Sequence, residues 1–249
     1  MHEVGTVQRA LALSSAGLNC CQIYRALGVP RRTISDWTRG KIPGTTERRY
    51  PDLAVESLAA QNAPAYAYLL GLYLGDGHIA RMQRTYCLRI SLDSAYPKII
   101  DSAAAAVDEL FPDGRVGKYR HARANLVIVS SYSRHWPRLL PQHGPGAKHL
   151  RKIELRPWQR RLTGAHPQQF IRGLIHADGC RYVANQRSRR RRYGYPRYGF
   201  SNTSRDILAL FCEHLDALGV HWTLATPERV QIAKREAVAR LDEFVGPKR

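Results

Sequence analysis

A nine-residue pattern occurs twice in this chain and limits the possible folds more than any other feature of the sequence. The first copy, LLGLYLGDG, covers residues 69–77, and the second, IRGLIHADG, covers residues 171–179. In each copy two small residues lie four positions apart and therefore share one face of a helix. These residues are Gly71 and Gly75 in the first copy, and Gly173 and Ala177 in the second. Because such small side chains let two helix backbones approach closely, the pattern predicts two helices packed against each other.

Each copy ends on an aspartate followed by a glycine, and the aspartates are Asp76 and Asp178. Packing of the two helices brings both carboxylates to the same end of the pair. That placement is costly, because the C-terminal end of a helix dipole is negative and because neighbouring carboxylates repel each other. A divalent cation such as Mg²⁺ removes both costs, since its preferred ligands are carboxylate and carbonyl oxygens. We therefore predict that Asp76 and Asp178 bind metal.

The same order of secondary structure is expected in both halves of the chain. Apolar periodicity predicts a motif helix, a strand, a helix, a second strand and a closing helix each time. In the first half these elements are residues 64–76, 86–94, 97–111, 125–131 and 133–140. In the second half they are residues 167–178, 198–204, 205–219, 229–234 and 235–246. One α+β unit is thus present twice.

The two copies resemble the motif of the LAGLIDADG homing endonuclease family, in the form with two motifs in one chain. The resemblance covers about residues 61–249. It implies an α+β fold of two pseudo-symmetric αββαββα halves, which form a saddle of antiparallel strands along DNA. It also implies that Asp76 and Asp178 bind Mg²⁺, or another divalent cation, over the minor groove. The backbone carbonyls of Gly75 and Ala177 would complete the site, and each half would hydrolyse one strand.

Two further residues are candidates for roles in catalysis. The sixth position of the family motif is Leu74 in the first copy and His176 in the second. Histidine is a residue type suited to proton transfer near neutral pH, although a histidine on such a helix is more often packed in the core. The family also places a basic residue on a late strand, and Lys234 matches it by its position before the closing helix. A solvated lysine is the alternative, and the corresponding position of the first half, near Ser131, has no lysine.

The N-terminal residues 20–40 read as a helix, a turn and a second helix. Apolar residues lie on one face of each helix, and Gly28 supplies the turn between them. This spacing resembles the helix-turn-helix of homeodomain-like and resolvase-type proteins, whose second helix enters the major groove. The residues then expected to face DNA are Arg31, Arg32, Ser35 and Arg39. A small helical hairpin with a solvated basic face is the alternative interpretation.

The charge of the chain points to a polyanionic partner. It contains 39 Lys and Arg against 20 Asp and Glu, which gives a formal net charge of +19. Basic residues occur in all regions without a long amphipathic basic helix, so duplex DNA is a better candidate than a membrane surface. Further DNA-binding candidates are Arg89, Arg187, Arg189, Arg190, Arg191, Arg192 and Arg197. All but Arg89 belong to a stretch rich in arginine and tyrosine, for which a solvated loop is the alternative.

The sequence thus predicts a site-specific, Mg²⁺-dependent double-stranded DNA endonuclease of the homing type. The alternatives are a transcriptional regulator that uses the same scaffold without cleavage, and an RNA maturase. The five cysteines include no C-x-x-C pair, and no signal peptide or membrane-spanning run is present, so an intracellular, nucleoid-associated monomer without a small-molecule cofactor is expected. The predicted parts are a helix-turn-helix domain (1–44), a linker (45–60), a first half (61–150), a basic linker (151–165) and a second half (166–249).

Overall fold

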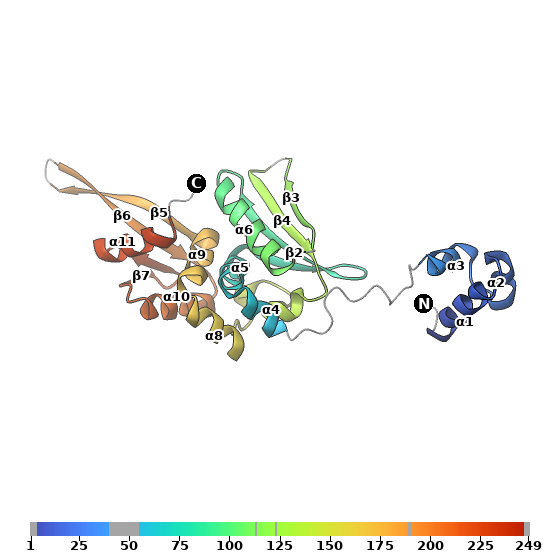
Figure 1. Ribbon diagram of the computed structural model, residues 1–249. Helices are drawn as coiled ribbons and strands as arrows, with labels where there is room; N and C mark the ends of the chain where they lie inside the picture. The colour runs from blue at the N-terminus through green and yellow to red at the C-terminus, as the bar shows by residue number, and fades with distance from the viewer. Residues whose placement is uncertain (1–3, 40–54, 113, 123, 189–190, 247–249) are drawn as a thin grey trace. The chain divides into compact units, whose positions relative to one another are not determined.

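The computed structural model describes residues 4–39, 55–112, 114–122, 124–188 and 191–246 (Figure 1). The chain consists of two compact units, Met1–Leu53 and Ala54–Arg249. None of the helices in the described ranges is both long and apolar enough to span a membrane.

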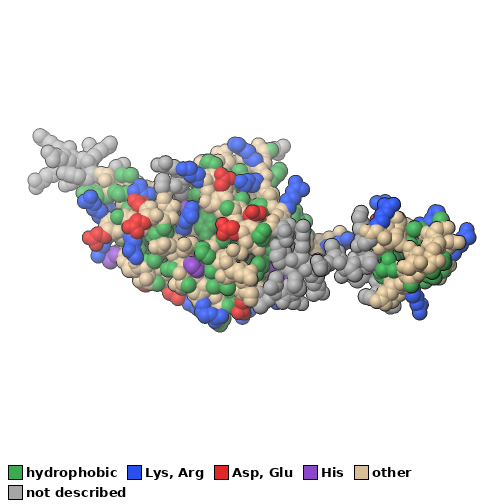
Figure 2. All heavy atoms as spheres, in the orientation of Figure 1, with side chains coloured by type: hydrophobic (Ala, Val, Ile, Leu, Met, Phe, Trp, Pro, Cys, Tyr) green, Lys and Arg blue, Asp and Glu red, His purple; other side chains and the backbone are tan. Residues whose placement is uncertain are grey.

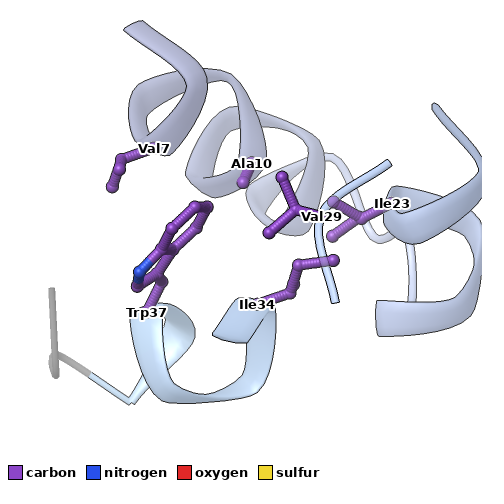
Figure 3. Packing of buried hydrophobic residues seen from close by; sticks show 6 residues of the cluster. All are labelled: Val7, Ala10, Ile23, Val29, Ile34 and Trp37. Carbon is purple, nitrogen blue, oxygen red and sulfur yellow. The ribbon is translucent and has the colours of Figure 1, made fainter. Parts of the chain in front are cut away.

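The N-terminal unit is a three-helix bundle. It contains α1 (Val4–Ser15), α2 (Cys20–Leu27) and α3 (Arg31–Thr38). Asn19 caps α2 by accepting hydrogen bonds from the backbone of its first turn, and Gly28 ends the helix with a φ of 66° that favours glycine. Figure 3 shows the buried side chains that hold the helices together, which are Val7, Ala10, Ile23, Val29, Ile34 and Trp37. The predicted helix-turn-helix is confirmed.

The C-terminal unit contains the two predicted halves. The first comprises α4 (Val55–Gln61), α5 (Ala63–Asp76), β1 (Gly77–Arg81), β2 (Tyr86–Asp93), α6 (Pro97–Leu110), β3 (Val116–Arg120), β4 (Leu126–Tyr132) and α7 (Trp136–Leu139). A 3-10 turn, η1 (Lys148–Leu150), lies in the connection to the second half. The second comprises α8 (Pro157–Ala165), α9 (Pro167–Asp178), β5 (Gly179–Ser188), β6 (Arg191–Ser201), α10 (Arg205–Ala217), β7 (Thr223–Thr226), β8 (Arg229–Ile232) and α11 (Arg235–Phe244).

Each half contains one four-stranded antiparallel sheet, and the two sheets have the same topology. The strand orders are β1-β2-β4-β3 and β5-β6-β8-β7. Helices α5 and α9 lie between the sheets (Figure 1), and they are the two motif helices. From α5 to α7 and from α9 to α11 the order of elements is αββαββα, so the predicted α+β fold of two similar halves is confirmed.

Helices cover one face of each sheet, and the other face of the first sheet carries the exposed side chains of Tyr119 and Tyr132. In the first half α6 packs on β2, β3 and β4, and Lys118 on β3 pairs with Asp101 on α6 at 2.5 Å. In the second half the rings of Phe200 on β6 and Phe211 on α10 stack with centroids 4.2 Å apart. Leu88, Ile90 and Val129 on the covered face of the first sheet are almost fully buried, as the alternation of strand side chains requires.

Several predicted boundaries need correction, and the strand predicted to begin at residue 198 begins already at Arg191, as β6. The linker predicted over 45–60 falls partly outside the described residues, and from Val55 onward it is the helix α4, whose Val55, Leu58 and Ala59 are buried. The basic linker predicted over 151–165 contains α8, which begins at Pro157, a residue favoured in a first helical turn. The strand predicted over 198–204 ends at Ser201, because Ser204 caps α10 by accepting from the backbone N–H of Ile207.

Candidate active site at the ends of two packed helices

The two motif helices touch through their backbones, as the spacing of their small residues predicts. A Cβ added at Gly71 would lie 2.5 Å from the carbonyl oxygen of Phe170 and 3.0 Å from the Cα of Gly173. A Cβ added at Gly173 would likewise lie 3.0 Å from the Cα of Gly71 and from the amide of Leu72. These separations leave no room for a side chain. Glycine is therefore required where α5 crosses α9.

We expect Gly71→Ala to destabilise the protein by an amount near the top of the range of about 1–3 kcal/mol seen for overpacked cores. The added methyl group meets backbone atoms of α9, which cannot rotate away. The matched control is Gly164→Ala in α8, where an added Cβ meets nothing within 4 Å and stability should rise by about 0.4–1 kcal/mol. Urea unfolding of both variants measures the difference, and equal stabilities would contradict the close crossing.

The glycines that follow the aspartates let each helix continue directly into a strand. Gly77 and Gly179 have extended backbones, with φ of −88° and −98°, so no left-handed conformation is involved. A Cβ at Gly77 would lie 2.8 Å from the carbonyl oxygen of Tyr73, and one at Gly179 would lie 2.9 Å from that of Ile175. Each strand therefore starts against the last turn of its helix. Asp76 and Asp178 are the last helical residues before this junction.

Asp178 extends toward the end of α5. Its Oδ2 lies 2.8 Å from the position that a Cβ on Gly75 would take. The same oxygen accepts a hydrogen bond from Nδ2 of Asn202 at 2.7 Å, and Asn202 follows the end of β6. Both aspartates are partly exposed. The structure thus brings the two motif ends together and fixes the carboxylate of Asp178 with a neutral amide donor.

A lysine from the connection between the halves reaches the same place. Nζ of Lys148 donates hydrogen bonds to the backbone oxygens of Tyr73 at 2.5 Å and Gly75 at 2.9 Å. It also lies 5.0 Å from the centre of the Tyr73 ring. These contacts place a positive charge at the negative C-terminal end of α5, where a cation is favoured.

The surroundings of Lys148 set its pKa. Burial lowers the pKa of Lys148 to about 8, and the negative charges of Asp178 and Asp76 act in the opposite direction. Arg151 lowers it further. Because both carboxylates act on one ammonium group, the Lys148 charge and the two motif ends form one electrostatic cluster.

An open pocket of about 500 Å³ adjoins this cluster. Its lining includes Asp178, Lys148 and Asn202, together with Gly75 and Gly77 on either side of Asp76. Three histidines, His78, His143 and His149, line it as well. Partial burial, and then the nearby charge of Arg151, lowers the pKa of His143. The pocket is therefore lined by groups of both charges and is accessible from solvent.

The oxygen atoms at this site fit a hard divalent cation. No three His, Cys, Asp or Glu side chains gather into a metal site anywhere in the described ranges, so an all-protein cage is not the expected form. Mg²⁺ commonly uses one or two carboxylates, keeps several waters and takes further oxygens from a substrate phosphate. The carbonyl oxygen of Gly75 accepts a hydrogen bond from the ammonium group of Lys148, and Oδ2 of Asp178 lies beside Gly75.

Two candidates from the sequence lie elsewhere. Lys234 is exposed at the N-cap of α11 and is not among the residues that line the pocket, so the geometry gives its predicted catalytic role no support. His176 is buried, with Nδ1 2.9 Å from the hydroxyl of Tyr68 and Nε2 3.3 Å from the carbonyl oxygen of Val245. These contacts join α9 to α5 and to the residue after α11. His176 is therefore a packed core residue, which is the alternative that the sequence left open.

The arginines predicted to contact DNA occupy three places. Arg31 and Arg32 are exposed on α3, Arg39 is exposed at its end, and Ser35 is half-buried. Arg89 is exposed on β2, and Arg197 is half-buried on β6. The remaining candidates belong to the β5–β6 hairpin. Arg189 and Arg190 lie outside the described residues, as do the side chains of Arg187, Arg191 and Arg192.

Sequence reasoning missed Lys148, because residues 144–165 read as a basic linker. The signal that could have found it is a second internal repeat. The letters GPGAK precede the second half, at residues 144–148, and GPK follows α11, at residues 246–248. Lys248 itself lies outside the described residues. A comparison of the two halves beyond their motif helices would have singled out both lysines.

Residues 2–44 match the homeodomain-like domain family. No curated protein matches the chain. Its fold is similar to mesophilic variants of the homing endonuclease I-DmoI, with 15% identity, a TM-score of 0.48, and coverage of 74% of this chain and 96% of that one. It is also similar to the LAGLIDADG meganuclease I-AabMI bound to uncleaved DNA, with 15% identity, a TM-score of 0.45, and coverage of 72% and 82%. For the LAGLIDADG homing endonuclease I-SmaMI bound to cleaved DNA, the identity is 8%, the TM-score 0.46, and the coverage 73% and 83%.

Proposed function

We propose that this chain is a metal-dependent, site-specific endonuclease of the LAGLIDADG homing type that cuts both strands of duplex DNA. One observation carries the proposal. Helices α5 and α9 end side by side on Asp76 and Asp178, and Lys148 is held against the same end by two backbone oxygens. Carboxylates that bind divalent cations, next to a positive group in an open pocket, suit the hydrolysis of a phosphodiester.

Each residue of this cluster has a part in the proposed reaction. Asp76 and Asp178 bind the divalent cation through their carboxylates, and Asn202 orients Asp178 by donating to its Oδ2. When bound, the cation lowers the pKa of the attacking water and stabilises the leaving oxygen. Lys148 has three ammonium donors, of which two are directed at the oxygens of Tyr73 and Gly75, so one can contact a phosphate oxygen.

The repeated architecture supports cleavage of both strands. Each half contributes one motif helix, one aspartate and one four-stranded sheet. A duplex has two antiparallel backbones, and a protein with two similar halves can present one acidic group to each. We therefore assign one scissile phosphate to Asp76 and the other to Asp178.

The N-terminal unit adds DNA affinity in this proposal. The match of residues 2–44 to the homeodomain-like family and the exposed Arg31 and Arg32 on α3 support a helix that enters the major groove. The charge of +19 favours a polyanion over a neutral partner. Figure 2 shows Lys and Arg side chains scattered over the visible face, with acidic side chains among them, so general attraction alone does not define a target sequence.

The test is a selection with the full-length protein on randomised DNA duplexes, with Mg²⁺ and with chelator. Sequencing of bound and of cut molecules should return one preferred sequence, which is cut only when Mg²⁺ is present. A protein that binds one sequence tightly but never nicks it under any divalent cation would be a regulator. A preference for structured RNA over duplex DNA would favour the maturase alternative.

Binding of the selected duplex should weaken steeply with salt. A protein that neutralises six phosphates releases the counterions condensed on them, so affinity should fall by about 10³-fold or more between roughly 50 and 200 mM salt. Fluorescence anisotropy at several salt concentrations, in chelator to prevent cutting, measures the slope. An affinity that does not change with salt would contradict binding dominated by contacts to the phosphate backbone of DNA.

A further inference from the structure

The segment that carries Lys148 has no apolar core of its own. Residues 142–151, here called the lysine loop, lie between α7 and α8 and include no regular structure except the 3-10 turn η1. The apolar residues of the loop, which are Pro145, Ala147 and Leu150, are all exposed, and Leu150 is 76% exposed. Burial of apolar surface therefore does not set the shape of the lysine loop, and polar contacts have to do so.

Arg151 closes the lysine loop. Its Nη1 donates hydrogen bonds to the carbonyl oxygens of Pro145 at 3.2 Å and Gly146 at 2.7 Å, and its Nη2 donates to that of Gln142 at 3.0 Å. The side chain lies against Gly144, where an added Cβ would be 3.4 Å from both Cδ and Nε of Arg151. Because a guanidinium group is planar and its donors have fixed directions, one side chain holds all three carbonyls in place.

The first residue of the lysine loop is anchored to both halves of the unit. Gln142 is 6% exposed, and its Nε2 donates to the carbonyl oxygen of Glu154 at 2.8 Å and to Oε1 of Gln159 at 2.7 Å. Gln159, on α8, in turn donates to the hydroxyl of Tyr66 on α5 at 2.7 Å. The contacts of Arg151 therefore join a fixed base to the turn that carries Lys148.

The contacts of Arg151 end two residues before Lys148. Gly146, whose carbonyl accepts from Arg151, has a φ of 74°, which favours glycine and turns the backbone at this point. Lys148 then reaches the oxygens of Tyr73 and Gly75. A lysine side chain loses much rotamer freedom when it is held in one place, so a backbone that is already in position lowers the cost of holding its ammonium group there.

Two features of Arg151 are unfavourable for stability. Its Nε is buried and has no hydrogen-bond partner among the described residues, and an unpaired buried donor is costly. Arg151 also lines the active-site pocket as a second positive group. Burial lowers the pKa of Lys148, and the nearby charge of Arg151 lowers it further. These features distinguish Arg151 from a purely stabilising contact.

We propose that Arg151 is a positioning residue, which shapes the lysine loop so that Lys148 serves one of the two cuts. Lys148 has one ammonium donor left for a phosphate, so it acts on one scissile phosphate and the effect of Arg151 is confined to that strand. The inference rests on the proposed nuclease function. It adds a residue that acts through Lys148 rather than on the DNA.

The first experiment follows each strand separately. The full-length protein cuts the selected duplex, labelled with a different dye on each strand, in a single turnover with Mg²⁺. Arg151→Met removes the donors, whereas Arg151→Lys keeps the charge without the planar group. We expect both variants to slow the cut of one strand by about 10- to 100-fold, so that nicked duplex accumulates, while the affinity for the duplex changes little. Melting temperatures confirm that the variants fold.

A double variant shows whether Arg151 acts through Lys148. If it does, Lys148→Met combined with Arg151→Met should cut no more slowly than Lys148→Met alone, because the group that Arg151 positions is already absent. The matched control is Arg160→Met. Arg160 pairs with Glu213 on the surface at 2.9 Å, so this variant should cut both strands like the parent protein.

A second experiment needs neither DNA nor metal. Endoproteinase Lys-C cuts after lysine, and the bond after Lys148 lies in a 3-10 turn whose lysine side chain is held by two carbonyls. Arg151→Met should increase cutting at this bond about tenfold, because cutting follows the population of the locally opened loop. Cutting after Lys98, which is exposed at the start of α6, should not change. Mass spectrometry identifies both products.

Equal slowing of both strands, parent rates in Arg151→Lys, or a further loss of rate in the double variant would each overturn the positioning role while the nuclease function stands. Unchanged cutting by Lys-C after Lys148 would also overturn it. A parent protein that cuts no duplex would instead overturn the proposed function, and the Lys-C digestion would still decide whether Arg151 holds Lys148 in place.

Discussion

Replacing either Asp76 or Asp178 by asparagine is expected to reduce double-strand cleavage by at least about 100-fold, because both are proposed to bind the metal directly. Mutation of a residue that only hydrogen-bonds to a metal ligand already reduces metal affinity or activity by about 10- to 100-fold. Asparagine keeps the size of the side chain but removes the negative charge that holds the cation. Binding to DNA should persist, and in chelator it should become tighter, because a carboxylate beside the phosphate backbone is repelled by it.

The same variants should fold normally. The glycine contacts between α5 and α9 remain, and an asparagine at position 178 still accepts the hydrogen bond from Asn202 through its carbonyl oxygen. The change in the free energy of unfolding should therefore be about 1 kcal/mol or less. Asp108→Asn is the control, since Asp108 is exposed on α6. Gel shifts measure binding, thermal melts measure stability and cleavage assays measure activity. Full cleavage by Asp178→Asn would refute the assignment of Asp178 as a metal ligand.

Replacing Lys148 by methionine should reduce cleavage by about 10- to 100-fold, the range found for groups that support a metal site from outside its ligands. The methionine removes the two hydrogen bonds to Tyr73 and Gly75 and the positive charge near the phosphate. Stability should change little, because the carbonyls face an open pocket that admits water and because a buried charge no longer has to be desolvated.

Two other lysines provide the controls for Lys148→Met. Lys152 is exposed and pairs with Glu154 at 3.0 Å, so Lys152→Met should cleave like the parent protein. Lys234→Met should also cleave at close to the parent rate, because Lys234 is exposed and outside the pocket lining. Loss of cleavage in Lys234→Met, with full activity in Lys148→Met, would restore the assignment made from sequence and exclude Lys148.

The sequence predicts the centre of the fold well because the relevant constraints are local. Pairs of small residues four positions apart, present in two helices, predict that the two helices pack closely. The crossing at Gly71 and Gly173 confirms this. The alternation of apolar residues predicts the strands, and the repeat predicts that the halves are alike. The structure also explains the glycines after the aspartates, which allow each strand to start against its helix.

The sequence does not predict the position of Lys148, because that depends on the path of an irregular connection. Residues 144–156 have no periodicity, and only the packing of both halves brings Lys148 to the oxygens of Tyr73 and Gly75. Lys234 illustrates the converse. The sequence predicts its place before α11, but the direction of an N-cap side chain is set by the tertiary structure. The sequence also does not predict α4 and α8, because both helices are short and the residues beside them resemble linkers.

The most direct test of the account is a crystal structure of the full-length protein with its selected duplex and Mn²⁺, using anomalous scattering to locate the metal. The account predicts anomalous peaks in contact with the carboxylates of Asp76 and Asp178 and with phosphates of the two strands. Metal bound elsewhere in a complex that still cuts DNA, or a cut duplex with neither aspartate near a peak, would contradict it.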